Sequence, residues 1–259
     1  MNFGRSGLAA ITGMLLLLLT GVWPATASTV LYQDFDTGTT SNWELALAGR
    51  PDLTVITAAN ADAAFSAQLG SADLAIVQFD QFAHSAGLRT DLLAYIAAGG
   101  RVIFSSQLDP QYDDVFGVMQ TGANGGSDFA SLIIDDLALA AGLSTPLLTV
   151  FNAPLLGTFW RSFGLTDPTA MGLATILDEF GVDLGLGIVL GNGGKTIING
   201  FAGSTIYGNG GFSDPSDEIQ LYKNEVNYLI PSAVPEPATG ALLGLGLLVT
   251  AALGYRRSK

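Results

Sequence analysis

Residues 74–106 have the sequence LAIVQFDQFAHSAGLRTDLLAYIAAGGRVIFSS, which decides the fold because it contains a complete strand–helix–strand unit. Leu74–Asp80 is apolar up to its polar end, as expected of a strand that is buried on both faces. Thr90–Ala98 has helical periodicity, Gly99-Gly100 ends that helix, and Arg101–Ser106 forms the next strand. Two strands joined in this way are expected to be parallel, with a right-handed crossover.

The same alternation extends toward the N-terminus. Strands are expected at Thr29–Asp36 and Leu53–Ala58, and helices at Asn42–Gly49 and Ala61–Leu69. A repeated strand–helix alternation builds a parallel sheet that is covered by helices. The sequence therefore predicts an α/β domain over residues 28–230, with a flavodoxin-like three-layer sandwich and a mainly parallel sheet.

The second half of this domain has a less regular pattern. Strands are expected near Leu147–Phe151, Ala174–Phe180 and Gly187–Phe201. The last of these contains Asn192-Gly193-Gly194, which is typical of a hairpin turn. Apolar residues at near-helical spacing predict that Asp217–Ile230 is an amphipathic helix that closes the domain.

This arrangement resembles class I glutamine amidotransferase-like domains. The residues that carry the resemblance are Ala75-Ile76-Val77, Leu92–Phe104 and Tyr222–Leu229. The family's catalysis requires a cysteine at a strand-to-helix elbow with a histidine nearby. The chain contains no cysteine, so the amidotransferase activity is not carried over.

Composition limits the classes of partner and chemistry. The 259 residues include 10 Lys and Arg against 23 Asp and Glu, for a net charge of −13. Such a surface repels phosphate backbones and anionic membranes, so nucleic-acid binding is disfavoured. The absence of cysteine excludes disulfides, cysteine–metal sites and a thiol nucleophile.

The first 27 residues have the three parts of a secretory signal peptide. Arg5 provides the positive charge, Leu8–Val22 the apolar core, and Ala25-Thr26-Ala27 a small-x-small cleavage site. We expect the Sec machinery and signal peptidase to act here, with cleavage after Ala27. The alternative is a retained membrane helix.

The C-terminal segment has three parts as well. Residues 231–237 form a proline-rich linker, residues 238–254 an apolar stretch that predicts a transmembrane helix, and residues 255–259 a basic cap. Basic residues favour the cytoplasmic side of a membrane, which leaves the domain outside. The residues of the cap that carry this charge are Arg256, Arg257 and Lys259.

The order of these parts resembles the PEP-CTERM sorting signal, with Val234, Pro235, Glu236 and Pro237 as its motif. The resemblance implies recognition by an exosortase, an integral membrane enzyme, and processing near this motif. It also implies passage through the inner membrane, anchored by the apolar helix, to the cell surface or extracellular matrix. The alternative is an ordinary C-terminal membrane anchor behind a proline linker.

Polar residues follow several of the predicted strands and are the candidates for a ligand site at the edge of the sheet. The single histidine, His84, follows the strand at 74–80. If the sheet is parallel, these residues meet at its carboxyl edge, where ligands commonly bind. Clustered carboxylates could hold Ca²⁺ or Mg²⁺, although solvated loop carboxylates are the simpler interpretation of so acidic a chain. The acidic residues concerned are Asp34, Asp36, Asp80, Asp109, Asp113 and Asp114.

No motif in the domain identifies a cofactor, a metal site or a catalytic residue. Residues 122–126 and 191–195 are rich in glycine, but neither matches a phosphate-binding loop, and the second fits a hairpin turn. No G-x-S-x-G nucleophile elbow is present.

Two functions remain open. The first is an exported surface or matrix protein whose domain binds exopolysaccharide or another surface protein without catalysis. The second is an exported, diverged amidotransferase-like hydrolase that uses His84 and the strand-end carboxylates.

Overall fold

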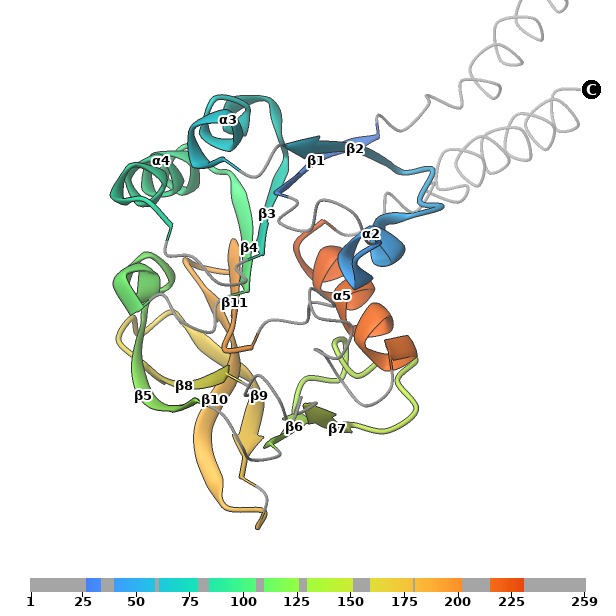
Figure 1. Ribbon diagram of the computed structural model, residues 1–259, viewed down its shortest axis with the longest axis vertical. Coiled ribbons are helices and arrows are strands. Elements are labelled where there is room, and N and C mark those ends of the chain that lie inside the picture. The colour runs from blue at the N-terminus through green and yellow to red at the C-terminus, as the bar shows by residue number, and fades with distance from the viewer. Residues whose placement is uncertain are drawn as a thin grey trace, which may run out of the picture. The chain divides into compact units, whose positions relative to one another are not determined.

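One mixed sheet extends through the part of the chain that the computed structural model describes (Figure 1). Its strands follow the order β2-β1-β3-β4-β11-β10-β9-β6-β7, and β5 and β8 pair with each other beside β10. The residues described are 27–33, 40–58, 61–78, 84–105, 110–125, 130–150, 159–178, 180–201 and 215–230.

The N-terminal half of the domain has the predicted alternation. Its four strands pair in parallel, and the late strand β11 (Thr196–Asn199) adds to β4 in parallel as well. All of β3 is buried, as expected of a central strand with helices on both faces. The four strands are β1 (Ser28–Gln33), β2 (Leu53–Ala58), β3 (Leu74–Gln78) and β4 (Arg101–Ser105).

Helices cover both faces of this parallel half. On one face lie α3 (Asp62–Ser66), η1 (Leu69–Ser71), α4 (Ala86–Ala97) and the 3-10 helix η2 (Pro110–Phe116). On the other lie α2 (Asn42–Leu47) and the closing helix α5 (Pro215–Leu229). Trp43 of α2 stacks on Tyr222 of α5, with ring centroids 3.9 Å apart.

The second half corrects the prediction of a mainly parallel, flavodoxin-like sheet. Its strands pair antiparallel, so that the sheet as a whole is mixed and largely antiparallel. Short connections such as the turn at residues 192–195 join its neighbouring strands. A parallel connection would need a crossover of about a dozen residues or more. The strands are β5 (Val118–Gly125), β6 (Ala130–Ile134), β7 (Leu147–Val150), β8 (Phe159–Leu165), β9 (Met171–Leu177) and β10 (Asp183–Gly191).

The predictions for the two ends of the chain lie outside the described residues, except for Ala27 at the expected cleavage site. These are the signal peptide, the proline-rich linker, the transmembrane helix at 238–254 and the basic cap. Within the described ranges, no helix is both long enough and apolar enough to cross a membrane.

Candidate functional site

The parallel strands end in polar side chains at the carboxyl edge of the sheet. Gln33, Gln78, Ser105 and Asn199 are the last residues of β1, β3, β4 and β11, and all four are at most 3% exposed. Ligands of open α/β sheets usually bind beyond such an edge. Gln33 contacts a polar network on the α3–α4 face, and Asn199 contacts a second network on the α2–α5 face.

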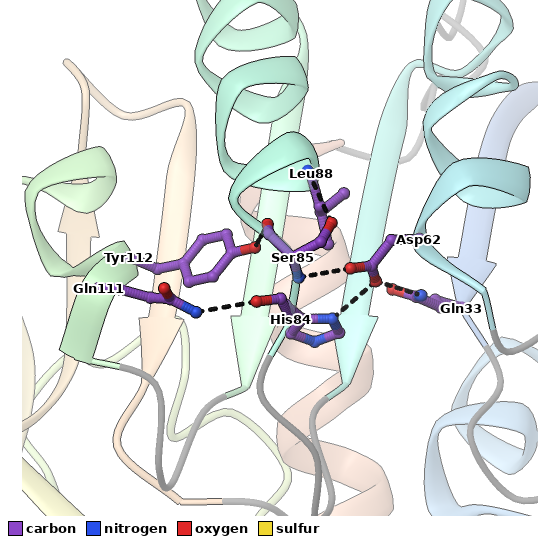
Figure 2. A network of polar contacts seen from close by, with 7 residues as sticks. All are labelled: Gln33, Asp62, His84, Ser85, Leu88, Gln111 and Tyr112. Atoms are coloured by element: carbon purple, nitrogen blue, oxygen red, sulfur yellow. Dashed lines mark hydrogen bonds and ion pairs between the residues drawn. The ribbon is translucent and has the colours of Figure 1, made fainter.

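His84 is the centre of the first network (Figure 2). Its Nδ1 lies 2.9 Å from Oδ1 of Asp62, at the start of α3. The backbone N–H of Ser85 donates to the other oxygen of Asp62 at 2.6 Å, and Gln33 Nε2 donates to Oδ1 at 3.3 Å. The His84 side chain is only 1% exposed. Asp62, at the start of α3, therefore links this helix to the end of β1 and to the segment that leads into α4.

The residues around His84 fix its backbone as well. Gln111 of η2 donates from Nε2 to the His84 carbonyl at 2.9 Å, and Tyr112 donates from its hydroxyl to the Ser85 carbonyl at 2.6 Å. The Ser85 hydroxyl accepts from the N–H of Leu88 at 3.2 Å and so caps α4. These contacts locate His84 at a junction of three helical segments.

Electrostatics keep Asp62 ionised. Burial disfavours its charged form, but the hydrogen bonds from Ser85 and His84 outweigh burial and lower the pKa of Asp62. A carboxylate that orients a histidine through Nδ1 is also found in catalytic triads. A general base must also reach its substrate, and the His84 ring is enclosed. In this arrangement the pair positions the start of α4.

We expect Asp62→Asn to lower the free energy of unfolding by about 1–3 kcal/mol at neutral pH, because charge-assisted hydrogen bonds are lost. The loss should shrink in acid. Because the pKa of Asp62 is lowered in the folded state, its carboxylate stabilises the fold at any pH above the unfolded-state pKa, and this contribution disappears as Asp62 is protonated. Urea unfolding from neutral to acidic pH measures both effects. Asp91→Asn, at an exposed position of α4, is the control. An equal loss in both variants would contradict the network.

Of the acidic residues that the sequence grouped together, the structure describes Asp113 and Asp114. Asp113 forms a buried ion pair with Arg161, and Asp114 an exposed one with Arg89. Across the described ranges, no three His, Asp or Glu side chains are grouped so that they could hold a metal ion. The other predicted edge residues, Asp34, Asp36, Asp80 and Asp109, lie outside the described residues.

The two glycine-rich segments have structural roles. Residues 122–125 belong to β5, where they pair with β8. The turn after β10 is confirmed as a hairpin, with left-handed φ angles at Asn192, Gly193 and Gly194.

The second polar network was not predicted. Glu225 of α5 is fully buried, and its Oε2 accepts from Asn199 Nδ2 at 3.0 Å, while Asn199 also contacts Ser105 at 3.2 Å. Glu218, also fully buried, accepts from Asn42 Nδ2 at 2.8 Å. Burial raises the pKa of Glu225 to about 8; the Asn199 hydrogen bond opposes this shift and the charge of Glu218 adds to it. The sequence did contain a signal for this network, because Glu218, Tyr222 and Glu225 are spaced so that they lie on the same face of the helix.

Comparison with known proteins identifies the C-terminal segment and the fold. The family model of the PEP-CTERM protein-sorting motif matches residues 233–258. No curated protein matches the chain. The solved "mmIFT52 N-terminal domain" is 14% identical, with a TM-score of 0.52, over 80% of this chain and 99% of that one. A ThuA-like protein from Parabacteroides merdae ATCC 43184 is 10% identical, with a TM-score of 0.50, over 81% and 92%. At these identities the likeness concerns the fold alone.

Proposed function

We propose that this chain is an exported protein that an exosortase sorts to the cell surface or extracellular matrix, and that its α/β domain binds a matrix component without catalysis. The observation that carries the proposal is the PEP-CTERM match at residues 233–258. This match supports export, and it implies exosortase as the processing partner. It coincides with the motif Val234-Pro235-Glu236-Pro237, the apolar stretch and the basic cap.

Two observations favour a binding role over the diverged hydrolase. The chain has no cysteine for amidotransferase chemistry. His84, the residue on which the hydrolase hypothesis depends, is buried and engaged by Asp62. The fold shared with the ThuA-like protein is loosely compatible with an amidotransferase-like middle, and it brings no activity with it. The whole chain has a net charge of −13, which favours neutral or cationic partners for the domain, such as a neutral exopolysaccharide or a basic surface protein.

The sorting proposal predicts the covalent form of the mature protein. We expect a chain that begins at Ser28 and ends within residues 234–237, found outside the cell and absent when the host's exosortase gene is deleted. Intact mass spectrometry of fractionated cells measures both ends. Replacing Pro235 and Pro237 by alanine should retain the full tail in the membrane fraction.

The control is Pro231→Ala, which changes a proline outside the matched segment and should leave processing unchanged. A chain that keeps Lys259 in the inner membrane with or without exosortase would make the tail a plain anchor and refute the proposal. The binding role is tested separately, by retention of the processed protein on polysaccharide isolated from the matrix.

A further inference from the structure

Helix α5 packs two fully buried carboxyl groups against the rest of the domain. Glu218 and Glu225 lie two turns apart on the same face of the helix, and both are 0% exposed. One oxygen of Glu225 accepts a hydrogen bond from Asn199. Its other oxygen, Oε1, has no hydrogen-bond partner among the described residues. A carboxylate in such a place is costly, because burial penalises the charged form.

The groups that face Glu225 do not compensate a negative charge. β11 contributes Asn199 and β4 contributes Ser105, which are both neutral. The titratable groups nearby on α5 are Glu218 and Tyr222. Tyr32 of β1 interacts electrostatically with Tyr222. From α2, Asn42 binds Glu218 and the Trp43 ring covers Tyr222. Each titratable group in this described set is neutral or negative, so none of them offsets a negative charge on Glu225, whereas a proton would remove it.

We propose that α5 is held on the sheet by a proton, so that the neutral form of Glu225 favours the packed helix and its ionisation favours release. The helix ends at Leu229, and the matched sorting motif begins at residue 233. The element that this proton controls is therefore the one that leads directly into the sorting segment.

The sign of the effect follows from the two states of Glu225. In the docked helix its pKa is about 8, whereas the ordinary value of 4.5 applies once the helix is released into solvent. The released form therefore loses its proton first as the pH rises. Between these two values, the equilibrium for release rises about tenfold for each pH unit, and it levels off above the upper value.

Hydrogen–deuterium exchange of the whole processed protein tests this device. After correction for intrinsic exchange, we expect the opening equilibrium of residues 215–230 to rise about 400-fold from pH 5 to pH 8, given the docked pKa of about 8. In Glu225→Gln, which keeps the shape of the side chain without the titration, the same segment should show no such rise. Asp91→Asn on α4 should behave as the unsubstituted protein does.

Two results would overturn the proposal. One is flat protection of residues 215–230 over this pH range in the unsubstituted protein, a result that does not depend on how well the variant folds. The other is an equal rise in β3 (Leu74–Gln78), which would mean that the proton stabilises the whole domain and does not control α5 separately. A rise that persists in Glu225→Gln would assign the effect to another group and refute the role of Glu225.

Discussion

Replacing Arg161 by methionine is expected to lower the free energy of unfolding by about 3–5 kcal/mol, because it leaves a buried acid without its partner. Arg161 is 1% exposed and Asp113 is 6% exposed. The guanidinium donates from Nη2 to Asp113 and from Nε to Gln120 Oε1 at 3.0 Å. Burial raises the pKa of Asp113, and the hydrogen bond and charge of Arg161 oppose that shift. Without Arg161, no charge from this guanidinium offsets the effect of burial on the pKa of Asp113.

Urea unfolding of two further variants tests this interpretation. The double variant Arg161→Met, Asp113→Leu should recover most of the lost stability, because apolar side chains can replace a buried ion pair at little cost. Arg89→Met is the matched control, since it breaks the exposed pair with Asp114 and should cost at most about 1 kcal/mol. If the double variant were as unstable as the single one, the buried pair would not be the cause.

Replacing Trp43 by alanine is expected to cost about 3–5 kcal/mol of unfolding free energy, which is the usual loss for a fully buried aromatic side chain. Trp43 is 0% exposed and stacks on Tyr222 with an angle of 11° between the rings. It is the main aromatic contact between α2 and α5 among the described residues. Removing it leaves a cavity between two helices that are far apart in sequence.

Thermal and denaturant unfolding measure this loss. Leu45→Ala provides the control on the same short helix, because Leu45 is 43% exposed and should cost less than about 1 kcal/mol. Similar losses in the two variants would show that α2 does not dock through Trp43. Trp43→Phe should fall between them, since a smaller ring fills part of the space.

The parallel half of the sheet could be predicted from the sequence because its signals are local. β2 has the predicted bounds, and β3 and β4 begin where expected. The helix between β3 and β4 was placed too late: α4 begins at Ala86 and not at Thr90, because Ser85 caps it. A serine followed by Ala86-Gly87 was a weak signal, and the capping bond to Leu88 is visible only in the structure.

The antiparallel half was harder because glycine there has a packing role. A Cβ at Gly187 of β10 would lie 2.5 Å from Ile176 of β9, and one at Gly172 would lie 2.4 Å from Leu186. These glycines let neighbouring strands approach, whereas in a sequence glycine more often indicates a turn or a break. β5 and β8, which both contain glycine, were therefore missed, and β9 was placed three residues too late. The short strand β6 has no glycine and was missed as well.

The polar networks depended on contacts between distant residues. Asp62 begins a short helix and meets His84 22 residues later, and nothing near either residue indicates the pair. The helix that closes the domain was predicted from its apolar residues, and its glutamates Glu218 and Glu225, both buried, were not singled out. The sequence did place His84 correctly after β3, near the end of a parallel strand. What it could not provide was the enclosure that decides the role of this residue.

The position of β11 determines when the domain can finish folding. This strand, at residues 196–199, completes the parallel ladder beside β4, and α5 at 215–229 covers the face that β1, β3 and β4 present. The core around the first strands to be synthesised therefore cannot be completed until nearly the last segment of the domain is present. Contacts so distant along the chain form slowly. A chain that emerges from a ribosome or a translocon N-terminus first will hold its early strands incomplete until its C-terminal elements have followed.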